Sequence, residues 1–162
     1  MKAFFLTSLN LAQPQLIMNN PRMLFLFVLF FISCSSPRVV LKGQLQRVSG
    51  NNMPSPDLPA EDPPGFAGTI LFFEPTAVNQ ADPTREQGVY RMTGKTLLAK
   101  AEADSTGRFQ VKLKPGKYSV LIGRKGLYYS NITDLDGSIN PVTIHRKGTA
   151  ILKLRADWDA VY

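Results

Sequence analysis

Residues 104–122 read DSTGRFQVKLKPGKYSVLI, and this stretch determines the predicted fold class. In its first half, RFQVKL, apolar and polar side chains alternate, a period of two that predicts a strand with one buried face. Pro115 and Gly116 follow as a turn signal, because proline fixes φ and glycine accepts a positive φ. Apolar residues resume after the turn, which predicts a β-hairpin of residues 107–113 and 117–123.

Shorter strand-like runs lie on both sides of this hairpin, separated by turn residues, and none shows a helical apolar period over three turns. Residues 95–103 contain good helix formers, but we favour a strand because a turn leads directly from them into the hairpin. About seven short strands in one small domain predict an all-β fold, a single two-sheet β-sandwich. The predicted strands are residues 39–48, 69–73, 89–92, 95–103, 107–113, 117–123, 140–145 and 150–154. A loop is predicted over residues 51–65, which contain five prolines.

A hydrophobic segment precedes this domain. Residues 23–33 read MLFLFVLFFIS, too short to cross a hydrocarbon core of about 30 Å as a helix, and they follow the positively charged Arg22. This pattern is typical of a secretory signal peptide, which we place at residues 1–33. A start at Met18 would give the signal a compact, ordinary length, so we expect Met18 to be the true first residue.

The chain has one cysteine, Cys34, directly after the small residue Ser33. Residues 31–34, Phe-Ile-Ser-Cys, resemble a bacterial lipobox, with Phe31 where leucine is usual. The resemblance implies cleavage between Ser33 and Cys34 and a diacylglyceryl group on the cysteine sulfur, followed by a tether of residues 34–40. The alternative is an incidental cysteine after an ordinary signal peptide or an uncleaved anchor.

Residues 104–120 resemble the D-x-x-G-x-F and L-x-P-G-x-Y-x-V core of the carboxypeptidase regulatory-like domain, a transthyretin-like Greek-key sandwich. Further likeness to the first strand and the G-Y step of that family lies in residues 42–45 and 126–129. Small envelope lipoproteins of Bacteroidota are similar at residues 50–56, 134–143 and 160–162. The resemblance implies one sandwich over residues 41–162 that serves as a rigid accessory or surface module.

Asp134, Asp136 and Asn140 are spaced somewhat like a calcium loop, but the glutamate that closes such loops is absent. A polar turn is the simpler interpretation, and we expect no metal or other cofactor. His145 is the only histidine, so it cannot form a His/Cys metal cluster, and we expect it at the end of a strand.

Three aromatic residues, Tyr128, Tyr129 and Trp158, are candidates for stacking on a carbohydrate or peptide, and the alternative is that they fill or cap the core. Asp157 and Asp159 flank Trp158, and strand alternation predicts both on one exposed face. We do not expect this pair to act in acid–base catalysis.

The formal net charge is +7, but lysine and arginine are scattered among apolar residues. This distribution predicts the solvent-exposed faces of strands and no nucleic-acid partner. We therefore expect a non-catalytic envelope lipoprotein with a structural role or an envelope protein as partner, and a carbohydrate-binding surface module is the alternative. Residues 35–38 contain no acidic side chain, which favours the outer membrane facing the periplasm over display outside the cell.

Overall fold

A computed structural model describes residues 37–51, 53, 62–146 and 151–161. The predicted signal peptide and Cys34 lie outside the described residues, as does most of the predicted proline-rich loop. The described chain is all β, as predicted, apart from one turn of 3-10 helix. Its elements are β1 (Val39–Asn51), β2 (Gly68–Phe73), η1 (Val78–Gln80), β3 (Val89–Tyr90), β4 (Leu97–Ala103), β5 (Arg108–Leu113), β6 (Gly116–Arg124), β7 (Leu127–Tyr129), β8 (Pro141–Ile144) and β9 (Ile151–Val161).

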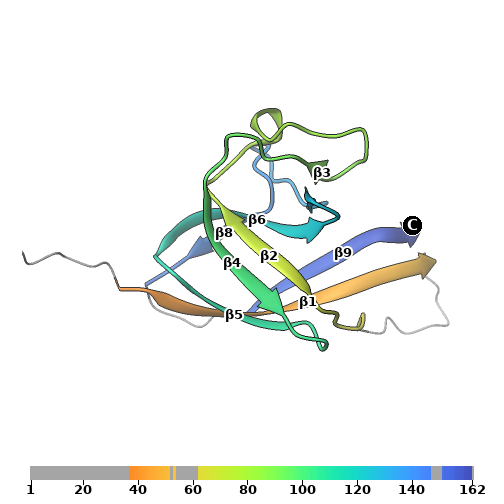
Figure 1. Ribbon diagram of the computed structural model, residues 1–162, viewed down its shortest axis with the longest axis horizontal. Helices are drawn as coiled ribbons and strands as arrows, with labels where there is room; N and C mark the ends of the chain where they lie inside the picture. The colour runs from red at the N-terminus through yellow and green to blue at the C-terminus, as the bar shows by residue number, and fades with distance from the viewer. Residues whose placement is uncertain (1–36, 52, 54–61, 147–150, 162) are drawn as a thin grey trace, which may run out of the picture. The chain divides into compact units, whose positions relative to one another are not determined.

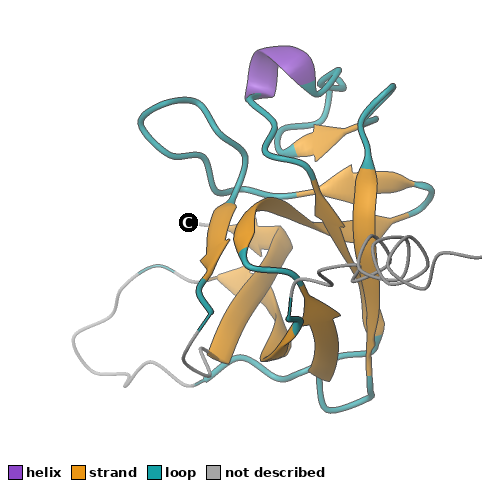
Figure 2. Cartoon of the chain, turned by 90° about the vertical axis from the view of Figure 1, so that its left-hand side faces the viewer, coloured by secondary structure: helices purple, strands orange, loops and turns teal. Residues whose placement is uncertain are grey.

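The strands form a β-sandwich of two sheets (Figure 1). The smaller sheet has the order β5-β1-β9, and the larger one has the order β3-β7-β6-β2-β4, with β8 paired to the first half of β6. β1 and β9 run parallel, while every other pair in the described chain is antiparallel. The segment between β2 and β3, which includes η1, lies beyond the larger sheet in both Figure 1 and Figure 2.

The predicted hairpin of residues 107–113 and 117–123 is wrong, although both of its strands form. β5 pairs with β1 in the smaller sheet, whereas β6 pairs with β2 on one edge and with β7 and β8 on the other. Val120 on one face of β6 and Ser119 and Leu121 on the other are all fully buried, so β6 is buried on both faces and occupies the interior of the larger sheet. The turn at Pro115 therefore leads from one sheet to the other.

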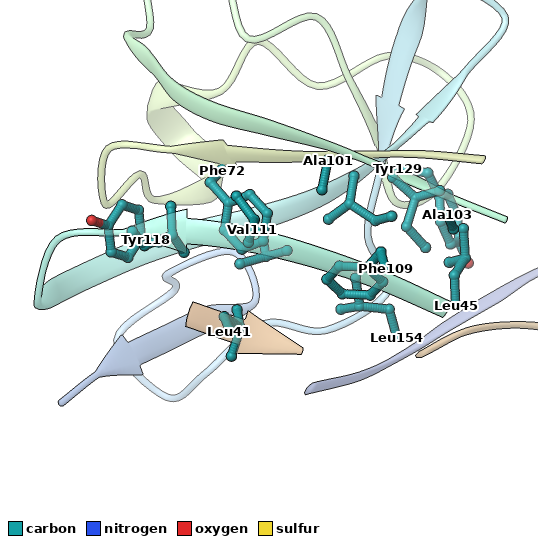
Figure 3. Packing of buried hydrophobic residues seen from close by; sticks show 14 of the residues in the cluster. Leu41, Leu45, Phe72, Ala101, Ala103, Phe109, Val111, Tyr118, Tyr129 and Leu154 are labelled. Carbon is teal, nitrogen blue, oxygen red and sulfur yellow. The ribbon is translucent and has the colours of Figure 1, made fainter. Parts of the chain in front are cut away.

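The main core lies between the two sheets (Figure 3). Phe109, Val111 and Leu113 of β5 are buried in it, as their alternation predicts. Phe72 and Tyr118 meet edge to face in this core, with ring centroids 6.2 Å apart. Its other buried members are Leu41, Leu45, Ile70, Val89, Ala101, Ala103, Val120, Ile122, Tyr129, Ile144, Leu154 and Ala156. Since the chain has one cysteine, no intrachain disulfide adds to the stability that this apolar burial provides.

A second apolar cluster lies on the other face of the larger sheet. Its strand residues are Leu71, Phe73, Tyr90 and Leu121, and Ala81, Met92 and Ile139 come from the segments that cover them. The backbone N–H of Thr76 donates to the buried Oγ of Ser119 at 2.9 Å and fastens the covering segment to β6. The polar, irregular stretch after β2 thus shields a second face of the same sheet.

The turn between β4 and β5 explains the D-x-x-G pattern. The Oδ1 atom of Asp104 accepts hydrogen bonds from the side chain and backbone of Thr106 and from the backbone of Arg108, and these bonds hold the pKa of Asp104 below its usual value. Gly107 has φ +78°, and a Cβ there would lie 2.0 Å from the carbonyl oxygen of Leu45. Only glycine allows the turn to approach β1 this closely.

The described residues form nine strands, where about seven were expected. Residues 127–129, missed as a strand, form β7, and β9 continues to Val161, well beyond residue 154. β1 begins at Val39, inside the predicted tether, and ends at Asn51, inside the predicted loop. Residues 97–103 form a strand, as favoured over a helix, because they pair with β2 and bury Ala101 and Ala103.

Candidate functional site

The largest gathering of predicted site residues is a pocket of about 430 Å³ beside the end of β9. We call it the Trp158 pocket. Tyr129 and Trp158 line it together with Asp157, so the structure brings together three residues that the sequence singled out from two distant segments. The remaining lining residues are Glu86, Gln87, Gly88, Asn131 and Ala160.

A β-bulge in β9 shapes this pocket. Arg47 of β1 is in register with Ala156, but Ser49 is in register with Asp159, so β9 carries one extra residue over this step. Such a bulge locally changes the direction of side chains. It occurs at Asp157 and Trp158, where the strand passes the end of β7.

The prediction that Asp157 and Asp159 share one exposed face is wrong. The half-buried Asp157 accepts a 2.5 Å hydrogen bond from the Tyr129 hydroxyl and another from the Asn131 amide. Asp159 instead forms a 2.8 Å ion pair with Arg47 of β1, and both of these side chains are largely exposed. The bulge breaks the alternation that the prediction assumed, so the two carboxylates bind different partners.

The indole of Trp158 is held on several sides. It meets Tyr129 edge to face at 4.9 Å and Phe66 edge to face at 6.1 Å between ring centroids. The guanidinium of Arg124 lies over the indole, 5.0 Å from its centroid, and also pairs with Glu86. Because the Arg124 side chain is only 17% exposed, this cation–π contact is partly shielded from water.

Tyr128 does not join the other two aromatic residues. Successive side chains of a strand point to opposite faces, so Tyr128 lies against the second apolar cluster while Tyr129 enters the main core. Tyr128 meets Phe73 edge to face at 5.1 Å. Tyr129, which is 4% exposed, is a core residue whose hydroxyl reaches the pocket.

The polar loop around Asp134 forms the expected turn. The Oδ1 atom of Asp134 accepts hydrogen bonds from the backbone N–H groups of Asp136 and Ser138, at 3.1 and 2.8 Å. Asn140 uses its side-chain amide elsewhere, on the carbonyl of Val120 at 2.9 Å. Among the described residues, no three His, Cys, Asp or Glu side chains form a group that could hold a metal ion. His145 follows directly after β8, at the end of a strand as predicted.

Sequence reasoning missed Glu86 and Asn131, which line the Trp158 pocket, and Arg124, which lies over the indole of Trp158. Glu86 and Arg124 come from different segments, and no local pattern pairs them with each other or with Trp158. The sequence also gave no sign that its scattered cations would gather, yet a cavity of about 890 Å³ is lined by Arg38, Lys100, Lys112, Lys114 and Lys117.

Within the described part of the chain, no helix is long and apolar enough to cross a membrane. Comparison of the chain with protein-family models, with curated proteins and with solved structures found no match.

Proposed function

We propose that this chain is a non-catalytic lipoprotein of a bacterial cell envelope. A lipid on Cys34 holds it at the membrane, on the outer membrane facing the periplasm, and its β-sandwich serves as a structural or protein-binding module of the carboxypeptidase regulatory-like type. Two acyl chains anchor a protein stably where one does not, because each buried methylene contributes about 0.8 kcal/mol.

The observation that carries this proposal is the start of the folded domain. β1 begins at Val39, only five residues after Cys34. A lipid on that cysteine would therefore attach almost directly to the central strand of the smaller sheet. Such a short connection suits a module that works close to a membrane surface.

The polar groups of the Trp158 pocket support a role without catalysis. Asp157 accepts hydrogen bonds from Tyr129 and Asn131 and so joins the end of β9 to the larger sheet, while Glu86 pairs with Arg124 at the end of β6. A general acid or base must instead reach a proton of the substrate. The single histidine, His145, does not line this pocket.

Crosslinking in intact envelopes tests the protein-binding role. A tagged lipoprotein is crosslinked, solubilised and purified beside a Cys34→Ala variant that lacks the lipidation residue. We expect one envelope protein to be crosslinked to the lipoprotein and lost from the variant. Absence of any specific partner, together with unchanged envelope properties after deletion of the gene, would refute an interaction role.

A second candidate, a carbohydrate-binding module, is favoured by the mixture of an aromatic ring with amide and carboxylate groups in the Trp158 pocket. It ranks second because Arg124 already covers the indole and Tyr129 is buried. Trp158 is the only tryptophan, so its fluorescence reports on the pocket directly. Titration with envelope glycans that leaves this fluorescence unchanged would remove this candidate.

A further inference from the structure

Unpaired positive charge gathers at one end of the sandwich. Arg38, Lys112, Lys114 and Lys117 line the 890 Å³ cavity, where β5 ends, the link to β6 begins and the chain enters β1. We call these four residues the basic end. All four side chains are exposed, and no acidic residue lines the cavity.

The opposite end of the same strands gives a direct comparison. There Arg47 is paired with Asp159, and Arg124 is paired with Glu86. None of the four residues of the basic end has an ion-pair partner among the described residues. Lys100, which also lines the cavity, is excluded from the set because it pairs with Glu102 at 2.7 Å. Other described cations, such as Lys125 and Lys153, also lack an ion-pair partner, but they do not line this cavity. The basic end is distinguished because four such cations surround one cavity that no acidic residue lines.

More positive charge extends this end. Ile144 of β8 is in register with Gly116, so Arg146, two residues further on, follows the edge of the sheet at the same end. Arg146 is exposed and also lacks an ion pair within the described chain. A concentration of exposed cations without counterions favours an anionic partner.

The position of Cys34 in the chain indicates which anionic partner the basic end meets. Arg38 follows Cys34 by four residues, which span at most about 14 Å even when fully extended. A lipid on Cys34 would bring the start of β1, and with it the basic end, to the layer of lipid headgroups. This step rests on the proposed lipidation.

We propose that the basic end is the membrane-facing surface of the sandwich and that it binds the phosphates of anionic lipid headgroups. Lysine and arginine form charge-assisted hydrogen bonds with phosphate oxygens. The Trp158 pocket, at the other end of β1 and β9, then faces away from the membrane. Each basic residue near an anionic surface strengthens binding about fivefold at moderate salt.

Lysine reactivity on vesicles tests this orientation. The mature lipoprotein is inserted into vesicles of phosphatidylcholine alone or of phosphatidylcholine mixed with phosphatidylglycerol, and exposed amines are acetylated with a water-soluble reagent. Mass spectrometry then gives the rate at each lysine. We expect Lys112, Lys114 and Lys117 to react about fivefold more slowly on the anionic vesicles. High salt should restore their rates, because it screens the attraction.

Two exposed lysines outside the basic end, Lys125 and Lys153, are the internal control and should react equally on both vesicles. The double variant Lys114→Glu/Lys117→Glu should lose the protection of Lys112. The matched variant Lys125→Glu/Lys153→Glu should keep it.

The outcomes separate the two proposals. Equal rates on both vesicles, for a protein that floats with both, would overturn the orientation and leave the lipid anchor in place. Failure to float with phosphatidylcholine vesicles in high salt would overturn the anchor, and the orientation with it. Equal protection of the three lysines by inorganic phosphate alone would show a simple anion site and would also overturn the orientation.

Discussion

Replacement of Gly107 by alanine tests how the two sheets are joined. Gly107 has φ +78° at the end of the turn between β4 and β5, and its carbonyl accepts a 2.7 Å hydrogen bond from the backbone of Leu45. An added Cβ would lie 2.0 Å from the Leu45 carbonyl oxygen, so the turn must move away from β1. That movement breaks the hydrogen bond and opens the adjoining core.

Gly126 provides a matched control. It has φ +80°, nearly the same backbone conformation, but no atom lies within 4 Å of an added Cβ. Alanine in the left-handed region costs about 1–2 kcal/mol at either position. At Gly107 the unsatisfied backbone groups add about 1–3 kcal/mol. We therefore expect Gly107→Ala to lower the free energy of unfolding by about 2–5 kcal/mol and Gly126→Ala by about 1–2 kcal/mol.

Urea unfolding followed by Trp158 fluorescence measures both free energies, since Trp158 is the only tryptophan and packs between the sheets. The difference between the two losses of stability cancels the cost of placing alanine in the left-handed region, which both variants share. Equal losses of stability in the two variants would refute the close contact between this turn and β1.

The other predictions concern the core, acid stability and the Trp158 pocket. Replacing the fully buried Phe72 by alanine should lower the free energy of unfolding by about 3–5 kcal/mol, whereas replacing the 51% exposed Leu98 should change it by less than about 0.5 kcal/mol. Comparable losses for the two variants in urea unfolding would contradict the burial of Phe72. The lowered pKa of Asp104 means that its ionised form stabilises the fold. That contribution is complete above the ordinary aspartate pKa and disappears as pH falls through the lowered pKa. The Asp104→Ala variant should therefore lose stability less steeply in acid than the unchanged protein. Parallel pH profiles of the two unfolding midpoints would disprove this. Arg124→Ala should uncover Trp158 and move its emission to longer wavelength at a cost of about 0.5–1 kcal/mol, and unchanged emission would rule out the cation–π contact.

The alternation of polar and apolar residues predicted where strands form better than it predicted which strands pair. The run RFQVKL has one polar and one apolar face, and β5 indeed buries Phe109, Val111 and Leu113 and exposes the residues between them. In the next strand residues 120–122, VLI, are consecutively apolar, which is the pattern of a strand buried on both faces. That difference, more than the turn at Pro115, indicates that β6 belongs to another sheet.

The candidate site depended on contacts between distant segments. Tyr129 and Trp158 were identified from residue type alone, but the bulge in β9 that sends Asp157 to Tyr129 leaves no sign in the sequence. The basic end is similar, because Arg38 and Lys117 become neighbours only when β1 and β6 start at the same end of the sandwich. Strand pairing, which is not a local property, decides both.

Mass spectrometry of the mature N-terminus tests the central claim most directly. The protein is purified from membranes, digested, and searched for the peptide that contains Cys34. We predict that this peptide begins at Cys34 and carries acyl chains, and that a Cys34→Ala variant incorporates no labelled palmitate. An unmodified Cys34, a mature chain that retains residues 23–33, or palmitate incorporation that persists in the variant would contradict the account.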